Sequence, residues 1–385
     1  MSKILILVNH DIVIYNFRLE LVEKLIVAGY DVYVSSPYGE RIDDLVKIGC
    51  KYKKTEFLRH SKNPFREIIL LNEYYKLIKE INPNIVLTYT IKPNIYGGIA
   101  CSKLNMPFIV NITGLGTAVE NGGIIQKITL LLYKFALKKA QKVFFQNSEN
   151  RDFMIKHHIV KDNYALLPGS GVNLNHYQVL DYPPQDVIEF AFISRIMKEK
   201  GIEQFLNAAK YIRNKYPNTR FHVCGFCEQE YDQILKDLND NGTIIYHGMV
   251  RDVRTILKNV HCTVHPTYYP EGLSNVLLES CACGRPIITT NRSGCREVID
   301  DGINGFICKQ KDSEDLIKQI EKFISLPYEK KKQMGLAGRA KVEKEFDRNI
   351  VVQAYLDEIE RTLSQNGLQK DNKKQGNKIE DSQNA

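Results

Sequence analysis

Short apolar runs alternate with helical stretches along almost the whole chain. Residues 3–8, 31–35 and 51–56 are predicted β-strands, and residues 18–28 have the spacing of a helix with one apolar face. A helix between two strands returns the chain to the same end of the sheet, so that the strands lie parallel. The pattern therefore predicts an α/β fold with doubly wound parallel sheets.

The length of the chain predicts two such domains. At 385 residues it exceeds the usual size of one domain, and two domains of about 170 residues are expected. We expect a first Rossmann-like domain at residues 1–178, a linker with two prolines at 177–186, and a second Rossmann-like domain at 187–346. A last helix at 348–364 is expected to pack back on the first domain. Residues 365–385 lack apolar anchors and are expected to be disordered.

The composition is typical of a soluble globular protein. Hydrophobic residues make up 43% of the chain and charged residues 25%. No apolar run approaches the roughly 20 residues that span a bilayer. The first residues lack the apolar region and the cleavage site of a signal peptide. A cytoplasmic location is therefore expected.

The cysteines indicate the redox compartment, and the net charge limits the kinds of binding partner. The chain has nine cysteines, mostly inside apolar segments, which suits a reducing compartment. Cys224 and Cys227 form a C-x-x-C that suits a redox pair or half a zinc site, but no second pair follows at the spacing of metal ligands. The net charge of +8 suits a phosphorylated substrate or an anionic membrane surface. Charge alone does not exclude nucleic acid, but no nucleic-acid partner is expected.

A polar stretch at 265–297 concentrates the candidate chemistry. It contains HPTYYPEGLSNVLLES, in which Glu271 lies in a loop and Ser274 or Asn275 caps a helix that runs to about residue 283. Glu279 lies inside that helix. The first turn of a helix has unpaired backbone N–H groups that suit a phosphate. The two carboxylates can then reach hydroxyl groups at different depths of one ligand. The alternative is an ordinary capped helix with two solvated glutamates.

A second loop, Ser194-Arg195-Ile196-Met197-Lys198-Glu199-Lys200-Gly201, follows the first strand of the second half. It places Arg195 and Lys200 around one turn, next to a predicted helix N-terminus. A diphosphate needs this combination of fixed positive charge, a mobile cation and backbone N–H groups. Alone, such a loop is a solvated turn, but together with Glu271 and Glu279 it predicts a nucleotide-diphosphate site.

These two motifs resemble the retaining family 4 glycosyltransferases of GT-B fold. PEGLSNVLLES matches the E-x7-E motif of that family through Glu271 and Glu279, and SRIMKEKG matches its G-R-x4-K-G loop. The resemblance covers about residues 3–363. It implies two Rossmann-like doubly wound domains that face each other across a cleft, and sugar transfer with retention of configuration.

The resemblance also implies roles for single residues. Arg195, Lys200 and Glu271 are the catalytic candidates: the two cations bind the leaving diphosphate, and Glu271 binds the hydroxyls of the donor sugar. Glu279 binds the ribose. The backbone cradle for the phosphate is implied at Gly272, Leu273 and Ser274. The family uses no metal, and the chain has no D-x-D metal motif, so neither a metal nor another cofactor is expected.

Two departures from the family pattern stand out. Many members have a histidine near the donor sugar after the strand that corresponds to 108–112, where this chain has Asn111-Ile112-Thr113-Gly114. Asn111, Thr113 or the backbone of Gly114 are the substitutes, with no preference among them. Cys227 stands where a second glycine is usual.

Motifs in the first half resemble bacterial enzymes that extend sugars linked to undecaprenyl diphosphate in capsule, O-antigen or lipid-linked glycan synthesis. The motifs are Tyr15-Asn16-Phe17-Arg18, His60-Ser61-Lys62-Asn63-Pro64, residues 88–98 and residues 111–117. The resemblance implies a UDP-sugar donor, with N-acetylgalactosamine or a related sugar, and an enzyme on the inner face of the plasma membrane. The acceptor-side candidates are Asn16, Arg18, Lys92, Asn94, Thr113 and Gly114, although each suits a structural role as well.

The predicted helix at 123–142 has apolar residues beside several lysines. It is either a helix that covers the sheet with a solvated basic face, or a contact with an anionic membrane surface.

Three functions compete. The first is a metal-independent UDP-sugar transferase with a lipid-linked acceptor. The second is an isomerase of GT-B fold, a UDP-HexNAc 2-epimerase, which carries extra histidine and carboxylate groups in its cleft; no such pattern is evident near Glu271. The third is a basic binding protein without catalytic activity, against which the four intact charged residues of the two motifs argue.

Overall fold

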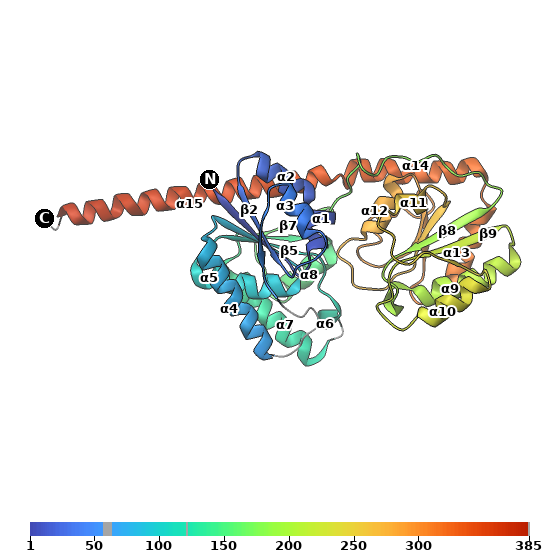
Figure 1. Ribbon diagram of the computed structural model, residues 1–385, viewed down its shortest axis with the longest axis horizontal. Helices are drawn as coiled ribbons and strands as arrows, with labels where there is room; N and C mark the ends of the chain where they lie inside the picture. Colours follow the sequence, from blue (N-terminus) through green and yellow to red (C-terminus); the bar gives the residue numbers. More distant parts are fainter. Residues whose placement is uncertain (57–63, 121, 384–385) are drawn as a thin grey trace. The chain divides into compact units, whose positions relative to one another are not determined.

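The computed structural model describes residues 1–56, 64–120 and 122–383. The chain forms two compact units (Figure 1). Unit 1 consists of residues 1–167 and 350–385, and unit 2 consists of residues 168–349. The predicted motif from His60 to Asn63 lies outside the described residues.

Unit 1 contains a parallel sheet with the strand order β3-β2-β1-β4-β5-β6-β7. Each strand pairs in parallel with its neighbours; Leu5 of β1, for example, faces Tyr33 of β2 on one side and Val86 of β4 on the other. The strands are β1 (Lys3–Leu7), β2 (Asp31–Ser36), β3 (Lys51–Lys54), β4 (Ile85–Tyr89), β5 (Phe108–Ile112), β6 (Lys142–Phe145) and β7 (Tyr164–Leu166). The sequence predicted this doubly wound sheet, and the prediction is confirmed.

Helices cover both faces of this sheet. Successive residues of a strand point to opposite faces, so Leu5 packs in one apolar core and Ile6 in another. The helical segments of unit 1 are α1 (Asp11–Phe17), α2 (Leu19–Val27), α3 (Ile42–Lys47), α4 (Pro64–Ile81), η1 (Pro93–Gly97), α5 (Gly98–Leu104), α6 (Thr117–Glu120), α7 (Gly123–Ala136), η2 (Leu137–Lys139), α8 (Ser148–Lys156) and α15 (Arg348–Gln383).

The first strand is followed directly by a helix that the sequence did not predict. Between the predicted strand at 3–8 and the predicted helix at 18–28 no further helix was expected, but α1 occupies most of this stretch. The ring of His10 accepts a hydrogen bond from the backbone N–H of Ile12 and so caps the helix. Arg18 then separates α1 from α2.

The predicted helix at 123–142 is shorter than expected. α7 ends at Ala136, and a 3₁₀ turn at Leu137–Lys139 follows. The chain becomes extended at Ala140 because it enters β6 at Lys142. Tyr133, Ala136 and Leu137 are buried against the sheet.

The last helix, α15, belongs to unit 1. Val351, Tyr355 and Ile359 are buried in the core on the same face as Ile6. The helix continues to Gln383, whereas the sequence predicted disorder after residue 364. This stretch has no proline and many residues with good helix propensity, so a helix that is nucleated in its packed part can continue by elongation.

Unit 2 repeats the architecture with the strand order β10-β9-β8-β11-β12-β13. The strands are β8 (Ile188–Ile193), β9 (Thr219–Cys224), β10 (Ile245–Tyr246), β11 (Cys262–His265), β12 (Ile287–Thr290) and β13 (Gly305–Cys308). The helical segments are η3 (Lys198–Lys200), α9 (Ile202–Lys215), α10 (Asp232–Asp240), α11 (Arg254–Leu257), α12 (Asn275–Ala282), α13 (Ser313–Ser325) and α14 (Tyr328–Glu345). This second predicted sheet is confirmed as well.

The predicted linker at 177–186 is instead a packed part of unit 2. The hydroxyl of Tyr182 donates a hydrogen bond to the carbonyl of His261 at 2.9 Å. The guanidinium of Arg285, which is fully buried, donates to the carbonyl of Asp181 at 2.7 Å. The prolines keep this segment extended while it lies along the unit, and the division between the units falls earlier, after Leu167.

Within the part of the chain that the structure describes, no helix has both the length and the apolar composition needed to cross a membrane.

Candidate active site

The two motifs of the second half meet at one edge of the unit 2 sheet. Arg195 follows β8 and Lys200 ends η3, while Glu271 follows β11. β8 and β11 are neighbouring parallel strands, so the loops at their carboxyl ends lie side by side. Open α/β sheets bind their ligands at this edge.

Lys200 and Glu271 form an ion pair at the centre of the site. Their side chains are only 8% and 15% exposed. Burial by itself would raise the pKa of Glu271, but the positive charge of Lys200 and the ring of His265 lower it to about 2. Glu271 is therefore an anion throughout the neutral range.

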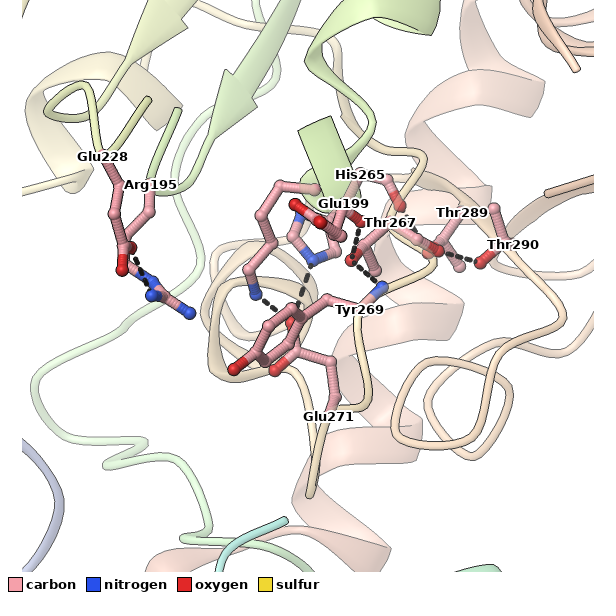
Figure 2. A network of polar contacts seen from close by, with 10 residues as sticks. Arg195, Glu199, Glu228, His265, Thr267, Tyr269, Glu271, Thr289 and Thr290 are labelled. Carbon is pink, nitrogen blue, oxygen red and sulfur yellow. Dashed lines mark hydrogen bonds and ion pairs between the residues drawn. The ribbon is translucent and has the colours of Figure 1, made fainter. Parts of the chain in front are cut away.

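His265, the first residue of the polar stretch at 265–297, is a member of the site for which the sequence predicted no role. It is the last residue of β11, is 1% exposed, and its Nε2 lies 3.9 Å from Oε1 of Glu271 (Figure 2). Burial lowers the pKa of His265 below its ordinary value; Glu271 beside it opposes this shift, and the charge of Lys200 adds to it. The neutral ring therefore predominates at pH 7. No pattern of extra histidine and carboxylate groups was evident near Glu271 in the sequence, and the structure places this one histidine beside it. The strand register brings His265 to this edge, which its sequence position alone does not reveal.

Tyr269 connects the two predicted cations. Its ring centroid lies 4.9 Å from Nζ of Lys200 and 5.3 Å from Cζ of Arg195. A ring face attracts cations through its quadrupole. Arg195 also forms an ion pair with Glu228, from the loop after β9 (Figure 2). The sequence predicted no role for Tyr269 or Glu228.

Backbone contacts hold the two loops together. The backbone N–H of Tyr268 donates to the carbonyl of Glu199 at 2.9 Å, and the hydroxyl of Thr267 donates to the same carbonyl at 3.2 Å. Gly201 has a φ of +81°, and a Cβ on it would lie 2.2 Å from the carbonyl oxygen of Pro266. Only glycine fits this position. The lysine of the first motif and the glutamate of the second are thereby held in register.

The predicted phosphate cradle is partly contradicted. Ser274 is the N-cap of α12, but its hydroxyl makes no capping hydrogen bond. Its backbone N–H donates to the carbonyl of Gly294 at 2.8 Å, and its side chain is buried. This N–H group is therefore already used. The side chain of Leu273 is buried in the core of unit 2, and the role of its backbone N–H group stays a prediction. Gly272, the remaining residue of the predicted phosphate cradle, lies next to Glu271 in the loop before α12.

Glu279 lies inside α12, as predicted, in a different environment from Glu271. Burial raises its pKa to about 7, although the charge of Arg348 and a hydrogen bond with Tyr177 oppose the rise. Arg348 in turn donates to the carbonyl of Gly171 at 3.2 Å. The two glutamates of the motif thus have opposite pKa shifts: the charge of Lys200 and the ring of His265 outweigh burial at Glu271, whereas burial outweighs the charge of Arg348 at Glu279.

The thiols of the C-x-x-C sequence are not activated. Burial raises the pKa of Cys224 to about 12, and burial also raises the pKa of Cys227. Reactive cysteines have lowered pKa values. The structure therefore favours neither as a nucleophile.

Two acceptor-side candidates of unit 1 lie in its interior. Arg18 is 2% exposed, and its guanidinium lies 5.3 Å from the ring centroid of Tyr89 and 5.6 Å from that of Tyr355. Asn94 is 1% exposed and donates to the carbonyl of Asn111 at 2.8 Å. These contacts are those of structural residues and contradict a direct contact of Arg18 or Asn94 with an acceptor.

Asn111, one of the substitutes for the missing histidine, is also internal. Its side-chain amide donates to the hydroxyl of Tyr355 at 2.7 Å, and the residue is 1% exposed. Of the three open alternatives, Thr113 and Gly114 remain partly accessible in the loop after β5.

Other candidates are accessible at the carboxyl edge of the unit 1 sheet. Asn16 is exposed near the end of α1. Lys92 forms an ion pair with Glu67 at 2.7 Å, and the two side chains are 18% and 15% exposed. Between β4 and Lys92, Thr90 has a φ of +70°. A β-branched residue in this region is strained, and such strain concentrates at functional sites.

The chain matches two models of protein families. The model described as glycosyl transferases group 1 matches residues 182–341, and the model described as glycosyl transferase 4-like matches residues 3–147.

Curated relatives carry related names. An N,N'-diacetylbacillosaminyl-diphospho-undecaprenol alpha-1,3-N-acetylgalactosaminyltransferase of Campylobacter jejuni is 26% identical over 91% of this chain and 96% of its own length. A UDP-Gal:alpha-D-GlcNAc-diphosphoundecaprenol alpha-1,3-galactosyltransferase of Escherichia coli is 26% identical over 74% and 77%. The capsular polysaccharide biosynthesis glycosyltransferase CapM of Staphylococcus aureus is 27% identical over 74% and 80%.

Solved structures share the fold. A glycosyltransferase from Rickettsia africae has a TM-score of 0.78 at 20% identity, over 94% of this chain and 98% of its own. Anabaena HepE in complex with UDP and glucose has a TM-score of 0.76 at 16% identity, over 94% and 100%.

Proposed function

This chain belongs to the family 4 glycosyltransferases of GT-B fold, and from that premise we propose that it is a retaining, metal-independent transferase. In this proposal it moves an N-acetylhexosamine such as N-acetylgalactosamine from its UDP form to a sugar on undecaprenyl diphosphate. Capsule, O-antigen or lipid-linked glycan synthesis would use such a product.

One observation carries the proposal: two cations and a carboxylate gather around Tyr269 in unit 2. When the glycosidic bond to UDP breaks, negative charge develops on the diphosphate. Arg195 and Lys200 are the groups that would stabilise it, in the role that a metal has in other transferases. Glu271 stays ionised beside them and can accept hydrogen bonds from hydroxyls of the donor sugar.

Retention of configuration has a separate line of support. The relatives from Campylobacter jejuni and Escherichia coli are named alpha-1,3-transferases, and common UDP-sugars are themselves α-linked, so an α product keeps the configuration. For this chain we propose a front-face displacement, in which the acceptor hydroxyl approaches on the side that the diphosphate leaves.

The acceptor and the location follow from the names of the relatives and from one exposed helix. Two of the relatives are named for undecaprenol-linked acceptors. On α7 the apolar residues Ile124, Ile128, Leu131 and Phe135 are 54–77% exposed. Lysines of the same helix are exposed beside them. We propose that α7 rests on the anionic inner face of the plasma membrane.

The alternative is a UDP-HexNAc 2-epimerase of the same fold, and His265 beside Glu271 is the observation that favours it. Release of UDP from a panel of UDP-sugars separates the two functions. It is measured in excess chelator, with and without a GlcNAc-diphosphoundecaprenol acceptor. Turnover that needs the acceptor and ignores the chelator is expected. Conversion of the donor without an acceptor identifies an epimerase, and loss of turnover in chelator refutes metal independence.

A further inference from the structure

A cavity of about 570 Å³ lies in unit 1, and the ion-paired residues Glu67 and Lys92 are among those that line it. It is at the carboxyl ends of β2, β3 and β4, where Tyr38, Glu56 and Lys92 line it. This edge is where open α/β sheets bind ligands. The volume is within the range of small-molecule sites, about 300–1,000 Å³.

The first half of α4 forms one wall of the cavity and contributes charged groups. Glu67 and Lys92 both line the cavity, and Nζ of Lys92 lies 2.7 Å from Oε1 of Glu67. Their pairing fixes the position of the Glu67 carboxylate. Arg66 also lines the cavity and is exposed at its edge.

Glu73, six residues beyond Glu67 on α4, has a side-chain oxygen that accepts no hydrogen bond within the described ranges. Its Oε2 is buried and receives no hydrogen bond from any residue in the described ranges. Burial raises the pKa of Glu73, and the charge of Glu56 raises it further. A buried carboxylate oxygen without a donor is costly. A ligand with hydroxyl or amide N–H groups would supply the missing donor.

The same part of α4 presents apolar side chains to solvent. Phe65, Ile68 and Ile69 are 77%, 57% and 56% exposed, and Ile69 also lines the cavity. A cavity lined by several charged side chains that adjoins exposed apolar side chains fits an amphiphile, with its polar head inside and its chain along the helix.

We propose that this cavity binds the saccharide head of a lipid-linked acceptor, with Glu67 and Glu73 accepting hydrogen bonds from its hydroxyl and amide groups. Arg66 is placed for the phosphate that joins the head to the lipid, and Phe65 and Ile68 contact the first units of the chain. The inference rests on the proposed function. It assigns the binding of the acceptor to these residues and not to Arg18 or Asn94.

The variants Glu67→Gln and Glu73→Gln test the saccharide contacts. The acceptor is GlcNAc-diphosphoundecaprenol in detergent micelles. The KM for this acceptor is expected to rise about tenfold or more, while the KM for the UDP-sugar stays unchanged. Glu80→Gln is the matched control, because Glu80 lies at the other end of α4 in an exposed ion pair with Lys53. Equal urea midpoints show that the variants fold. An unchanged acceptor KM in both variants overturns the assignment.

A second experiment tests the contact with the lipid chain separately from the contacts with the saccharide head. Phe65→Ser with Ile68→Ser is expected to raise the KM for the undecaprenyl acceptor and to leave the KM for a short-chain GlcNAc-diphosphate acceptor unchanged. An equal effect on both acceptors contradicts the lipid contact.

Direct binding of the acceptor without nucleotide distinguishes a wrong cavity from a wrong function. If the wild-type chain binds the acceptor and Glu73→Gln does not, the cavity is correct even where no UDP-sugar is transferred. If both bind equally, the cavity is wrong whatever the activity.

Discussion

Lys200 and Glu271 form a largely buried ion pair although 71 residues separate them in the sequence. The pair connects the loop after β8 to the loop after β11, and the ring of Tyr269 faces its lysine. Lys200, the proposed ligand of the diphosphate, and Glu271, the proposed ligand of the sugar, are therefore electrostatically coupled.

Removal of Lys200 is expected to destabilise unit 2. Lys200→Met leaves the Glu271 carboxylate without its counterion, which costs about 3 kcal/mol. The double variant with Glu271→Gln is expected to recover most of this loss, because no charge is left unpaired. Urea unfolding at pH 7 measures both; losses that simply add would show that the pair is not coupled.

The stability of the protein at low pH is expected to depend on the same ion pair. The pKa of Glu271 is lowered from its ordinary 4.5 to about 2. The stability that the pair contributes is therefore fully present above pH 4.5 and is lost as the pH falls toward 2. The difference in urea midpoint between the wild type and Glu271→Gln should shrink over that window and stay constant from pH 5 to 8.

Glu271→Gln is also expected to reduce sugar transfer by about 10²–10³-fold. UDP should bind within a few fold of the wild type, since the proposed contact of Glu271 is with the sugar. Single-turnover rates and calorimetry with UDP check the two parts. Wild-type rates in this variant would remove Glu271 from the catalytic residues.

Glu279→Gln is expected to stabilise the protein in alkali. The pKa of Glu279 is raised to about 7 mainly by burial, so its contribution to stability is present below pH 4.5 and is lost as the pH rises through 7. The variant cannot ionise, and its urea midpoint should exceed that of the wild type at pH 8 but not at pH 5. A constant difference between the two pH values contradicts the shift.

Glu228→Gln is expected to tighten UDP binding several fold. In the wild type, Arg195 is paired with Glu228, and a diphosphate has to compete with that carboxylate. Glu230→Gln is the matched control, because Glu230 is exposed two residues further along. Calorimetric titration with UDP gives the affinities, and weaker binding in Glu228→Gln would mean that Glu228 orients Arg195 for its ligand.

Ile128→Glu with Leu131→Glu is expected to release the protein from vesicles. Both residues are 54% exposed on α7, and charge there opposes insertion among lipid headgroups. Flotation with phosphatidylglycerol vesicles should show binding at least tenfold weaker than the wild type. Ile234→Glu, at a 47% exposed position of α10 in unit 2, serves as the control; equal loss in both variants argues against a specific role of α7.

Several features of the site were predictable because they depend on local sequence. The strand-to-helix alternation predicted both sheets, and loops at the ends of parallel strands meet at one edge. The positions of Arg195, Lys200, Glu271 and Glu279 on loops or helices followed from turn and cap residues around them.

Other features depend on partners that are distant in the sequence. Ser274 has the residue type of a helix cap, but the carbonyl of Gly294 occupies its N–H group. Arg18 has the charge of a phosphate ligand, but it is packed near Tyr89 and Tyr355. The amphipathic pattern of α7 fits a sheet-covering helix, yet only its Tyr133 side is buried. Periodicity shows that a helix has an apolar face and does not show what covers that face.

By itself, the sequence determined the α/β class, the two sheets and the charged residues at the edge of the second sheet, because strand periodicity, turn chemistry and motif spacing are local properties. The paired charges, the occupied N–H groups and the positions of His265, Tyr269 and Glu228 became known from the three-dimensional fold. Ion pairing and burial depend on strand order and register, which bring together residues far apart along the chain.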